Sequence, residues 1–530
     1  MALILSLGRL LPELILDYKM DVHYMTKNKI TKTILLVSLL FLLTTCNVTD
    51  LTPNDQIDLT KFYSSASDAE LGLIGGYIRT FESPAVNFIF YNNRSSDDLT
   101  APIDGRQSDH LMFRPNLIET SGDAGSLWND CYGALASLNL LIERVPKIDE
   151  KAFPKPRPGE QNRKYQIVGE ARFLRAYIYF HLTQFFGDVP LITKFPTSSD
   201  PADNQVARSP VAQVMDTVKS DLAYANQYLP WNHDNLVVIA DDKVIQSKGR
   251  ATRGAAKLLM ARIYLKNREW QKAIDECKEI IASGQFRLTA RWTRIFSSSG
   301  ESGQNSSESI LEIQTKGQRL NPGEFNNTGG YAWFHQDGAP RRGATLEAFD
   351  LFEGDKTTKR DVRKEFTMSQ SSTVPSQIYA LKYANSFPWW DAANPFNFIP
   401  MRLTECYLIM AEALNEISYP NLEALDYINT IRGRARDANY IGGATIGIAP
   451  YSFTTFDTQT KFRLGIREER RRELMFEGQR WFDLLRFDEM DGTTKALEAV
   501  GLTSKERTLF PIPQDEIVRN SLLKQNPGYN

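Results

Sequence analysis

Two pairs of segments with helical periodicity constrain the fold of this chain more than any other feature of its sequence. Residues 253–267 and 269–284 make the first pair, and residues 402–416 and 421–435 make the second. In each segment apolar residues recur at i, i+3 and i+4, which predicts an amphipathic helix. The connections within a pair are only a few residues long, and this predicts two helical hairpins.

Small residues stand at matching positions of each pair, Ala261 with Ala273 and Ala411 with Ala424. Small side chains let two helices approach closely, as in tetratricopeptide-type pairs. We count about four degenerate pairs of this kind, and sequence without a repeat separates them. The pattern therefore predicts helix pairs but not a plain solenoid.

Further helices are expected from Ser67 onward, between Trp128 and Val145, and over residues 165–187. Between Phe286 and Pro400 the composition changes to long stretches rich in Gly, Asn, Ser and Pro, with short strands such as "SILEIQ" and "QIYALKY". The predicted fold class is mostly α, with an irregular, loop-rich part that contains short strands. Loops of such length in a compact domain are usually functional.

Ten apolar residues, Ile34 to Leu43, follow three lysines and precede "LTTC" at positions 43–46. A membrane-spanning helix needs about 20 apolar residues, so the run is too short to span and has the features of a secretory signal. We expect Cys46 to be the first mature residue and to carry lipid, although Thr45 replaces the usual Ala or Gly. Met25 is the expected start, and a buried strand is the alternative interpretation.

Composition argues against several functions. The net charge of −2, without clustered basic residues, argues against nucleic acid as a partner. Cys131, Cys277 and Cys406 are far apart in the sequence and are expected to be buried free thiols. Catalytic and metal-binding motifs are missing from the sequence, so we predict no enzyme activity, no cofactor and no metal.

The most highly charged segment, residues 465–487, is predicted to be one helix. Glu468 with Arg472, and Glu477 with Arg480, have the spacing of ion pairs on one helical face. Apolar residues are interleaved on all sides, and this predicts that several charges are buried and paired. Their role would be architectural. The tryptophans at 128, 270 and 481 lie in predicted helices and are expected in the core.

The sequence "IREERRRELMFEGQRWFDLLRF", together with "LFPIPQDEIVRNSLLKQNPGY" near the C-terminus, resembles the C-terminal signature of the SusD/RagB family. "GEARFLRAYIYFHLTQFFGDVPLIT" resembles its N-terminal signature, and "MRLTECYLIMAEALNE" its penultimate helix pair. The resemblance covers residues 46–530. It implies a surface-exposed outer-membrane lipoprotein with tetratricopeptide-like helix pairs and loops grafted on one side.

Members of that family sit as lids over a SusC-like, TonB-dependent transport barrel and hand nutrients to it. The resemblance therefore implies capture of oligosaccharide by a non-catalytic protein. A peptide ligand is an alternative, and so is a helical-repeat scaffold that binds only its barrel partner. The predicted regions are a signal segment (1–45), a tether (46–65), an N-terminal helical region (66–285), a loop-rich segment (286–400) and a C-terminal helical region (401–530).

Sugar binding needs aromatic faces together with polar side chains that hydrogen-bond to hydroxyls. Three segments expected to be loops offer both. The candidate ligand-binding residues are Tyr91, Asn92, Asn93, Arg94, Asp97 and Asp98 in the first, Tyr331 and Trp333 in the second, and Trp389 and Trp390 in the third. For each segment the alternative is that the aromatic side chain packs inward and fixes its loop.

Overall fold

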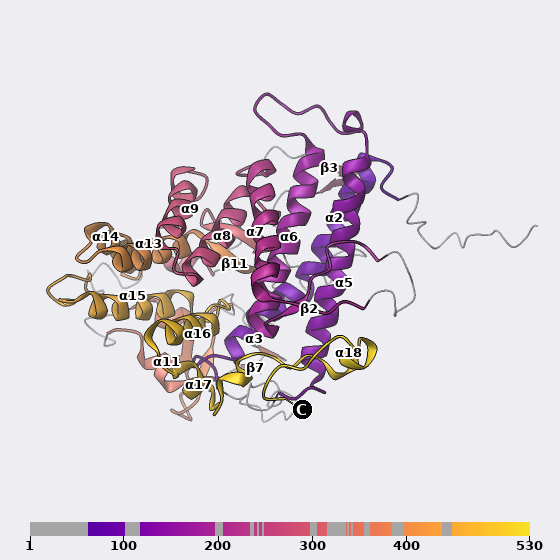
Figure 1. The fold of residues 1–530 in the computed structure, drawn as a ribbon. Helices are drawn as coiled ribbons and strands as arrows, with labels where there is room; N and C mark the ends of the chain where they lie inside the picture. The colour runs from indigo at the N-terminus through magenta and orange to yellow at the C-terminus, as the bar shows by residue number, and fades with distance from the viewer. Residues whose placement is uncertain are drawn as a thin grey trace, which may run out of the picture. The chain divides into compact units, whose positions relative to one another are not determined.

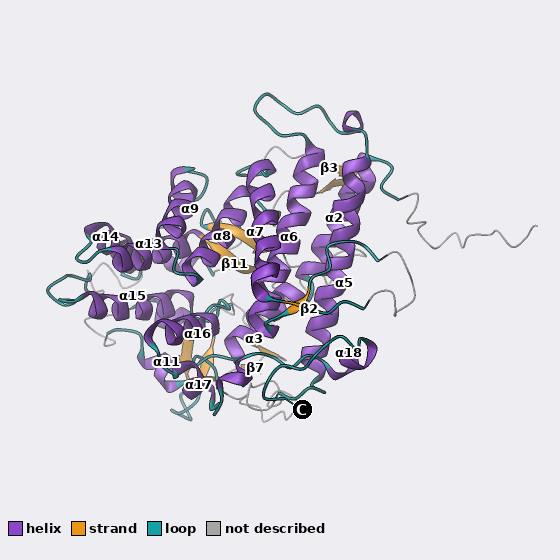
Figure 2. Cartoon of the chain, in the orientation of Figure 1, coloured by secondary structure: helices purple, strands orange, loops and turns teal. Residues whose placement is uncertain are grey.

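The computed structural model describes thirteen stretches of the chain between residues 62 and 529. Side chains are described for residues 62–100, 117–196, 205–233, 249–296, 305–314, 343–354, 361–383, 397–436 and 448–529, and four short strands add their backbone. Residues from Tyr63 onward form one compact unit, whose helices and strands are drawn in Figures 1 and 2. Cys46 and the signal and tether segments up to residue 61 lie outside the described residues.

Long helices build most of the core. They are α2 (Ala66–Phe81), α3 (Pro84–Arg94), α5 (Gly122–Arg144), α6 (Arg163–Phe186), α7 (Val211–Tyr228), α8 (Arg253–Lys266), α9 (Trp270–Ala282), α13 (Leu403–Ile417), α14 (Leu422–Arg434), α15 (Gln459–Leu474) and α16 (Arg480–Asp491). Shorter helices are α11 (Leu346–Asp350), α12 (Arg363–Thr367), α17 (Lys495–Val500) and α18 (Gln514–Arg519). Single 3₁₀ turns lie at Val145–Lys147, Glu150–Ala152, Trp292–Arg294 and Lys505–Thr508.

Helices that follow one another in sequence pack side by side. Each helix from α5 to α9 contacts the next, α9 contacts α13, and α13 contacts both α14 and α15. The two predicted hairpins, α8 with α9 and α13 with α14, are confirmed. They also adjoin each other, although the loop-rich segment separates them in the sequence. The fold is mostly helical with tetratricopeptide-like helix pairs, as predicted.

The helix α6 lies in this row between α5 and α7. It begins where the Asn162 side chain accepts a hydrogen bond from the backbone N–H of Lys164 (2.9 Å), and it ends at Gly187, whose φ of 72° favours glycine. All of its residues are buried except Lys164, Tyr165 and Arg172. A helix that is buried on nearly every side can only form inside a larger assembly of helices.

Strands are short. The longest form an antiparallel ribbon of β5 (Ser309–Ile313) and β11 (Phe398–Arg402). The β8 (Gly343–Ala344), β10 (Ile378–Ala380) and β9 (Met368–Gln370) strands form a three-stranded sheet. Two-stranded pairs are β1 (Val189–Pro190) with β2 (Arg208–Ser209), β3 (Val238–Ala240) with β4 (Lys243–Ile245), and β6 (His335–Gln336) with β7 (Ala339–Pro340).

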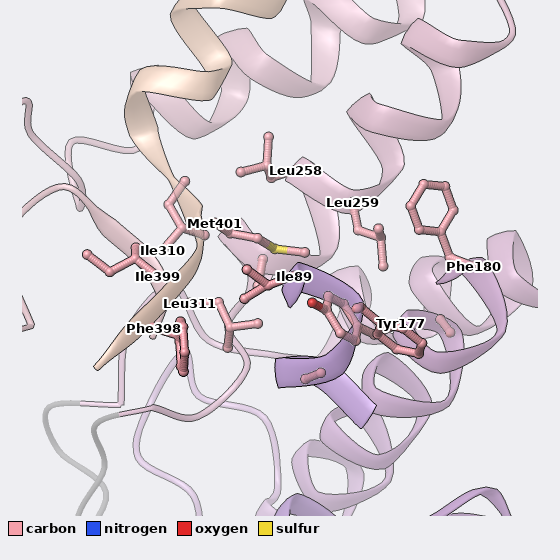
Figure 3. Close-up of a cluster of buried hydrophobic side chains, with 14 of the residues drawn as sticks. Ile89, Tyr177, Phe180, Leu258, Leu259, Ile310, Leu311, Phe398, Ile399 and Met401 are labelled. Atoms are coloured by element: carbon pink, nitrogen blue, oxygen red, sulfur yellow. The ribbon is translucent and has the colours of Figure 1, made fainter. Parts of the chain in front are cut away.

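The β5–β11 ribbon packs into the helical core. Ile310, Leu311 and Met401 lie beside Leu258 of α8 and Ile89 of α3 in Figure 3, and all five are buried. Burying each of these side chains contributes about 1.5–3 kcal/mol relative to leaving it exposed. The ribbon is therefore anchored through its apolar residues, and its position is fixed relative to α8.

The predicted single helix over residues 465–487 is wrong: the chain forms two helices, α15 and α16. Between them, Phe476 has φ 65° and Gly478 has φ 75°. A Cβ at Gly478 would lie 2.6 Å from the Cα of Ile89, so α3 approaches too closely for any residue but glycine. The close approach of a helix distant in sequence decides this break, and local periodicity gives no sign of it.

One of the two predicted ion pairs in this segment forms. Glu468 and Arg472 are 3.2 Å apart, as predicted. Glu477 instead pairs with Lys382 (2.6 Å) and Arg402 (2.7 Å), while Arg480 pairs with Asp97 (2.7 Å). The break between α15 and α16 separates Glu477 from Arg480, so their i, i+3 spacing no longer places them together.

Beneath α15 lies a buried network of ion pairs. Glu473 accepts from Arg363 (3.0 Å), Arg402 (2.8 Å), Arg434 (2.9 Å) and the Trp292 indole (3.0 Å). These arginines hold the pKa of Glu473 far below its ordinary value, although burial alone would raise it. The prediction that charges in this segment are buried and paired is confirmed.

The predicted core residues are mostly buried. Cys131, Cys277 and Cys406 are buried free thiols, as expected. Trp128 and Trp481 are buried as well. Trp270 is only partly buried and packs against the edge of the core.

Candidate functional site

The first predicted binding segment, residues 90–100, is not a surface loop. Tyr91, Asn92, Asn93 and Arg94 belong to the helix α3, and all four are buried. The Tyr91 ring packs edge-on against Phe510, with ring centroids 5.6 Å apart. Burial raises the pKa of its hydroxyl well above the ordinary value. The Tyr91 side chain therefore packs inward, which is the alternative to ligand binding that the sequence analysis gave for this segment.

Asn92 and Asn93 fasten α3 to the break between α15 and α16. The Asn93 amide donates to the Phe476 carbonyl (2.9 Å) and accepts from the backbone N–H of Gly478 (2.9 Å). Asn92 accepts from the backbone N–H of Trp481 (3.0 Å). The two asparagines therefore satisfy backbone groups that the break leaves unpaired.

Asp97 and Asp98 each pair with an arginine. Asp97 pairs with Arg480 (2.7 Å), and Asp98 pairs with Arg471 (2.8 Å). Burial raises the pKa of Asp98, and the neighbouring Asp97 carboxylate adds to this rise. The pKa of Asp97 is lowered despite its burial, because Arg480 donates hydrogen bonds to it. The structure gives both aspartates a role in holding α3 to α15 and α16.

The other predicted residues, Tyr331, Trp333, Trp389 and Trp390, lie outside the described residues. The described residues that flank their segments nevertheless meet in one place. The Asn397 amide donates to Glu312 (2.7 Å), and the Asn305 and Gln314 amides bond to each other (2.9 Å). Asn305 directly follows the segment 297–304, and Gln314 directly precedes the segment 315–334. Asn397 directly follows the segment 384–396.

Glu312 holds these chain ends together. Its carboxylate accepts from the backbone N–H of Asn305 (2.7 Å), from the Ser309 hydroxyl (2.5 Å) and from Asn397. The side chain is buried. An ionised carboxylate that accepts several short hydrogen bonds is a strong anchor, so the bases of three loop-rich segments are fixed at one side of the β5–β11 ribbon.

Beside these chain ends lies a hollow of about 180 Å³, which we call the ribbon hollow. Phe286 and Trp231 supply aromatic surface, and Gln285, Ser307 and Glu312 supply polar groups. Small-molecule sites combine apolar walls with a few placed polar groups in this way. Arg250 lines the hollow as well, so its walls combine aromatic surface with both charged and uncharged hydrogen-bonding groups.

A second hollow, of about 330 Å³, adjoins the first and shares Trp231, Asn232 and His233 with it. We call it the Tyr228 hollow, because the last residue of α7 lines it. Sequence reasoning missed this region. The signal that could have found it is "LPWNH" at positions 229–233, a tryptophan between proline and asparagine in a connection, the same kind of pattern as in "FPWWD".

Neither a bilayer-spanning helix nor a metal site is found in the described part of the chain. Within those ranges no helix combines the length and apolar character needed to cross a bilayer. No group of three or more His, Cys, Asp or Glu side chains there could hold a metal ion.

Comparison with known families gives two matches. Residues 392–529 match the family described as "SusD family", and residues 90–265 match the one described as "Starch-binding associating with outer membrane". SusD-like protein P2 of Formosa agariphila is 24% identical over 95% of this chain and 100% of its own length. SusD-like protein P38 of the same organism is 26% identical over 94% of this chain and 99% of its own length.

Solved structures share the fold. A laminarin-binding SusD-like protein superimposes with a TM-score of 0.67 at 24% identity, covering 88% of this chain and 100% of the other. A SusD homologue from Bacteroides thetaiotaomicron has a TM-score of 0.69 at 20% identity, covering 89% of this chain and 99% of its own.

Proposed function

Because this chain belongs to the SusD/RagB family, we propose that it captures oligosaccharide at an outer membrane and delivers it to a SusC-like, TonB-dependent transporter. It does so without catalysis. Cys46 carries the lipid that holds it at the cell surface.

The observation that supports glycan capture is the meeting of chain ends at the ribbon hollow. Gln314 and Asn397 lie at one end of the segments that contain Tyr331, Trp333, Trp389 and Trp390, and Asn305 bonds to Gln314. We propose these four aromatic residues as the ligand-binding ones, because they belong to segments whose ends flank a hollow with aromatic and polar walls. The fold neighbour described as laminarin-binding makes laminarin, a neutral polysaccharide, the first ligand to test.

The direct test is polysaccharide binding by the purified chain from residue 47 onward. In affinity gel electrophoresis, laminarin or another of a panel of neutral polysaccharides should retard the protein. Trp333→Ala should weaken binding about tenfold, the effect of losing a good aromatic contact together with its buried area. Trp270→Ala removes a partly buried tryptophan outside both hollows and is the matched control. A protein that no polysaccharide retards would refute glycan capture.

Delivery and anchoring need separate experiments. Radiolabelled palmitate should enter the wild-type chain in its native host and should not enter Cys46→Ser. A TonB-dependent barrel should co-purify with the tagged chain from detergent-solubilised membranes. Absence of the barrel would remove the transporter from the proposal, and a label retained by Cys46→Ser would remove the anchor at that position.

A further inference from the structure

The connection between α5 and α6 carries an exposed basic segment, residues 151–158, which we call the basic arm. Its sequence, "KAFPKPRP", holds three basic residues and no acidic one, in a chain whose net charge is −2. Phe153 is buried and fastens the arm to the core, and every other residue of the arm is exposed. The arm therefore presents Lys151, Lys155 and Arg157 to solvent, and nothing in the proposed function gives these three residues a role.

Prolines and a tight turn restrict the shape of the basic arm. Proline occupies every second position from 154 to 158, and each ring fixes its own φ near about −65° and keeps the preceding residue out of the helical region. Just beyond the arm, the Glu160 N–H donates to the Arg157 carbonyl (3.0 Å). Gly159 has a φ of 84°, as the third position of a type II turn requires. The arm therefore has few conformations to lose when a partner binds.

The basic side chains of the arm have no partner within the described part of the protein. No ion pair or side-chain hydrogen bond there involves Lys151, Lys155 or Arg157. Two backbone N–H groups and the Tyr165 hydroxyl donate to the neighbouring carboxylates, which belong to Asp149, Glu150 and Glu160. Three cationic groups are therefore left free to meet an anionic partner.

The basic arm lies at the end of the helix row where the folded unit begins. Near the starts of α6 and α2, Arg163 pairs with Glu70 (2.5 Å). Figure 1 shows the connection between α5 and α6 at the same end as the start of α2. Residues 47–61 join Cys46 to this end, and a chain of that length spans at most about 55 Å. Along the chain, the arm is thus on the side of the molecule that the proposed lipid anchor reaches first.

An anionic lipid surface fits this arm better than a single small ligand does. The basic groups are spread along an extended segment, and its exposed residues include no aromatic side chain that would stack on a sugar or a base. A membrane surface offers many phosphate groups side by side and needs no pocket. Each Lys or Arg close to such a surface strengthens binding about fivefold.

We propose that the basic arm contacts the phosphate groups of the membrane lipid around the anchor. Lys151, Lys155 and Arg157 bind headgroup phosphates, and the starts of α2 and α6 therefore face the membrane. Together with the anchor, this contact gives the protein two points of attachment and limits its rotation. The proposal rests on the proposed function only for the anchor at Cys46, and it uses none of the residues proposed to bind glycan.

Vesicle flotation of the chain from residue 47 onward measures the contact without the anchor. Vesicles made of equal parts phosphatidylcholine and phosphatidylglycerol should carry the protein, and vesicles of phosphatidylcholine alone should not. High salt should release it, because the basic groups are exposed to solvent. The joint variant Lys151→Gln, Lys155→Gln and Arg157→Gln should bind the charged vesicles about a hundredfold more weakly.

A matched control changes three exposed lysines near α17 and α18, at the other end of the molecule in Figure 1. The joint variant Lys495→Gln, Lys505→Gln and Lys524→Gln has the same net charge as the arm variant, and it should bind like wild type. All six side chains are exposed, and thermal unfolding checks that both variants are folded. An equal loss of binding in the two variants would show a general charge effect and overturn the arm as the contact.

The outcomes separate this proposal from glycan capture. Wild-type protein that the charged vesicles do not carry overturns the membrane contact, whether or not a polysaccharide retards it. Flotation that only the arm variant loses, without any polysaccharide retarding the protein, keeps the contact and overturns glycan capture. A barrel that co-purifies with wild type but not with the arm variant, in the absence of vesicle binding, overturns lipid as the partner and assigns the arm to the transporter.

Discussion

The helices α6 and α15 are both largely buried, but opposite kinds of side chain surround them. Around α6, aromatic rings dominate: Phe185 alone contacts Phe88, Phe482 and Phe510, with ring centroids 5.9, 5.2 and 5.0 Å away. Around α15 the buried residues are mostly charged, and Glu469 and Glu473 are fully enclosed by arginines. One helix is held by area removed from water, the other by paired charges.

This contrast explains how the loop-rich segment is attached to the helices. Apolar contacts tolerate small shifts, whereas ion pairs need fixed partners and fixed geometry. Two of the arginines that pair with α15, Arg363 and Arg402, come from the segment before α13 and lie near the ends of its loops. The charged core therefore positions the loop bases, while the aromatic core holds the helix row together.

Removing a central carboxylate should have the largest effect. Glu473→Ala leaves Arg363, Arg402 and Arg434 without a shared partner, and breaking such a buried pair typically costs about 3–5 kcal/mol. Chemical denaturation should show this loss in the free energy of unfolding. A cost below about 1 kcal/mol, as for exposed pairs, would mean that the network adds little to stability.

Truncating the aromatic core should cost a similar amount for a different reason. Phe185→Ala removes a fully buried ring, and such substitutions cost about 3–5 kcal/mol. Because no charge is involved, this loss should be the same at pH 5 and pH 8 in the same denaturation experiment. A clear dependence on pH would contradict the view that apolar packing dominates around α6.

Unfolding at low pH should test the contrast between α6 and α15, because α6 itself carries one buried carboxylate, Glu170. Arg250 and Arg163 lower the pKa of Glu170 from 4.5 to about 2 despite its burial. Its contribution to stability is therefore present above about pH 4.5 and is lost as the pH falls towards 2. The shift corresponds to about 3 kcal/mol, measurable as a falling unfolding temperature. Glu170→Gln should lose less stability than wild type over this interval.

The break between α15 and α16 gives a smaller effect with a close control. Gly478→Ala should cost about 2 kcal/mol or more, from its positive φ and from the contact of the new Cβ with Ile89. Gly492 has a similar φ of 69°, and nothing lies within 4 Å of its Cβ position. Gly492→Ala should therefore cost only the conformational part, about 1 kcal/mol. Equal costs in denaturation would exclude a role for the contact with α3.

The exposed pair on α15 should matter least. Glu468 is 56% exposed and pairs with Arg472 at 3.2 Å. Glu468→Gln should change the free energy of unfolding by less than about 0.5 kcal/mol, and added salt should remove the difference. A cost near that of Glu473→Ala would show that burial does not separate the two carboxylates.

The sequence predicted the helices well, because amphipathic periodicity and helix ends are local properties. The hairpins α8–α9 and α13–α14, the extent of α6 and its glycine end were all evident before the structure. So was the burial of charges between residues 465 and 487, since apolar residues interleave with them. The single helix predicted there was wrong, because Phe476 and Gly478 turn in response to α3, which lies far away in the sequence.

The candidate site was less predictable. Tyr91 and Asn93 have the composition of a binding loop, but they are buried in a helix whose partners come from the far end of the chain. The ribbon hollow was also hidden, because Glu312 and Asn397 are 85 residues apart and only the β5–β11 pairing joins them. Residue type alone did not reveal which side chains would face a cavity.

Local sequence patterns specify where helices form and which of them pair, and the motifs carry the family resemblance. Only folding brings α9 against α13 and gathers one end of each of three loop-rich segments near Glu312. The physical reason is that helical periodicity is encoded within a few turns of chain, whereas a cavity and a buried ion pair are made by residues that only folding brings together.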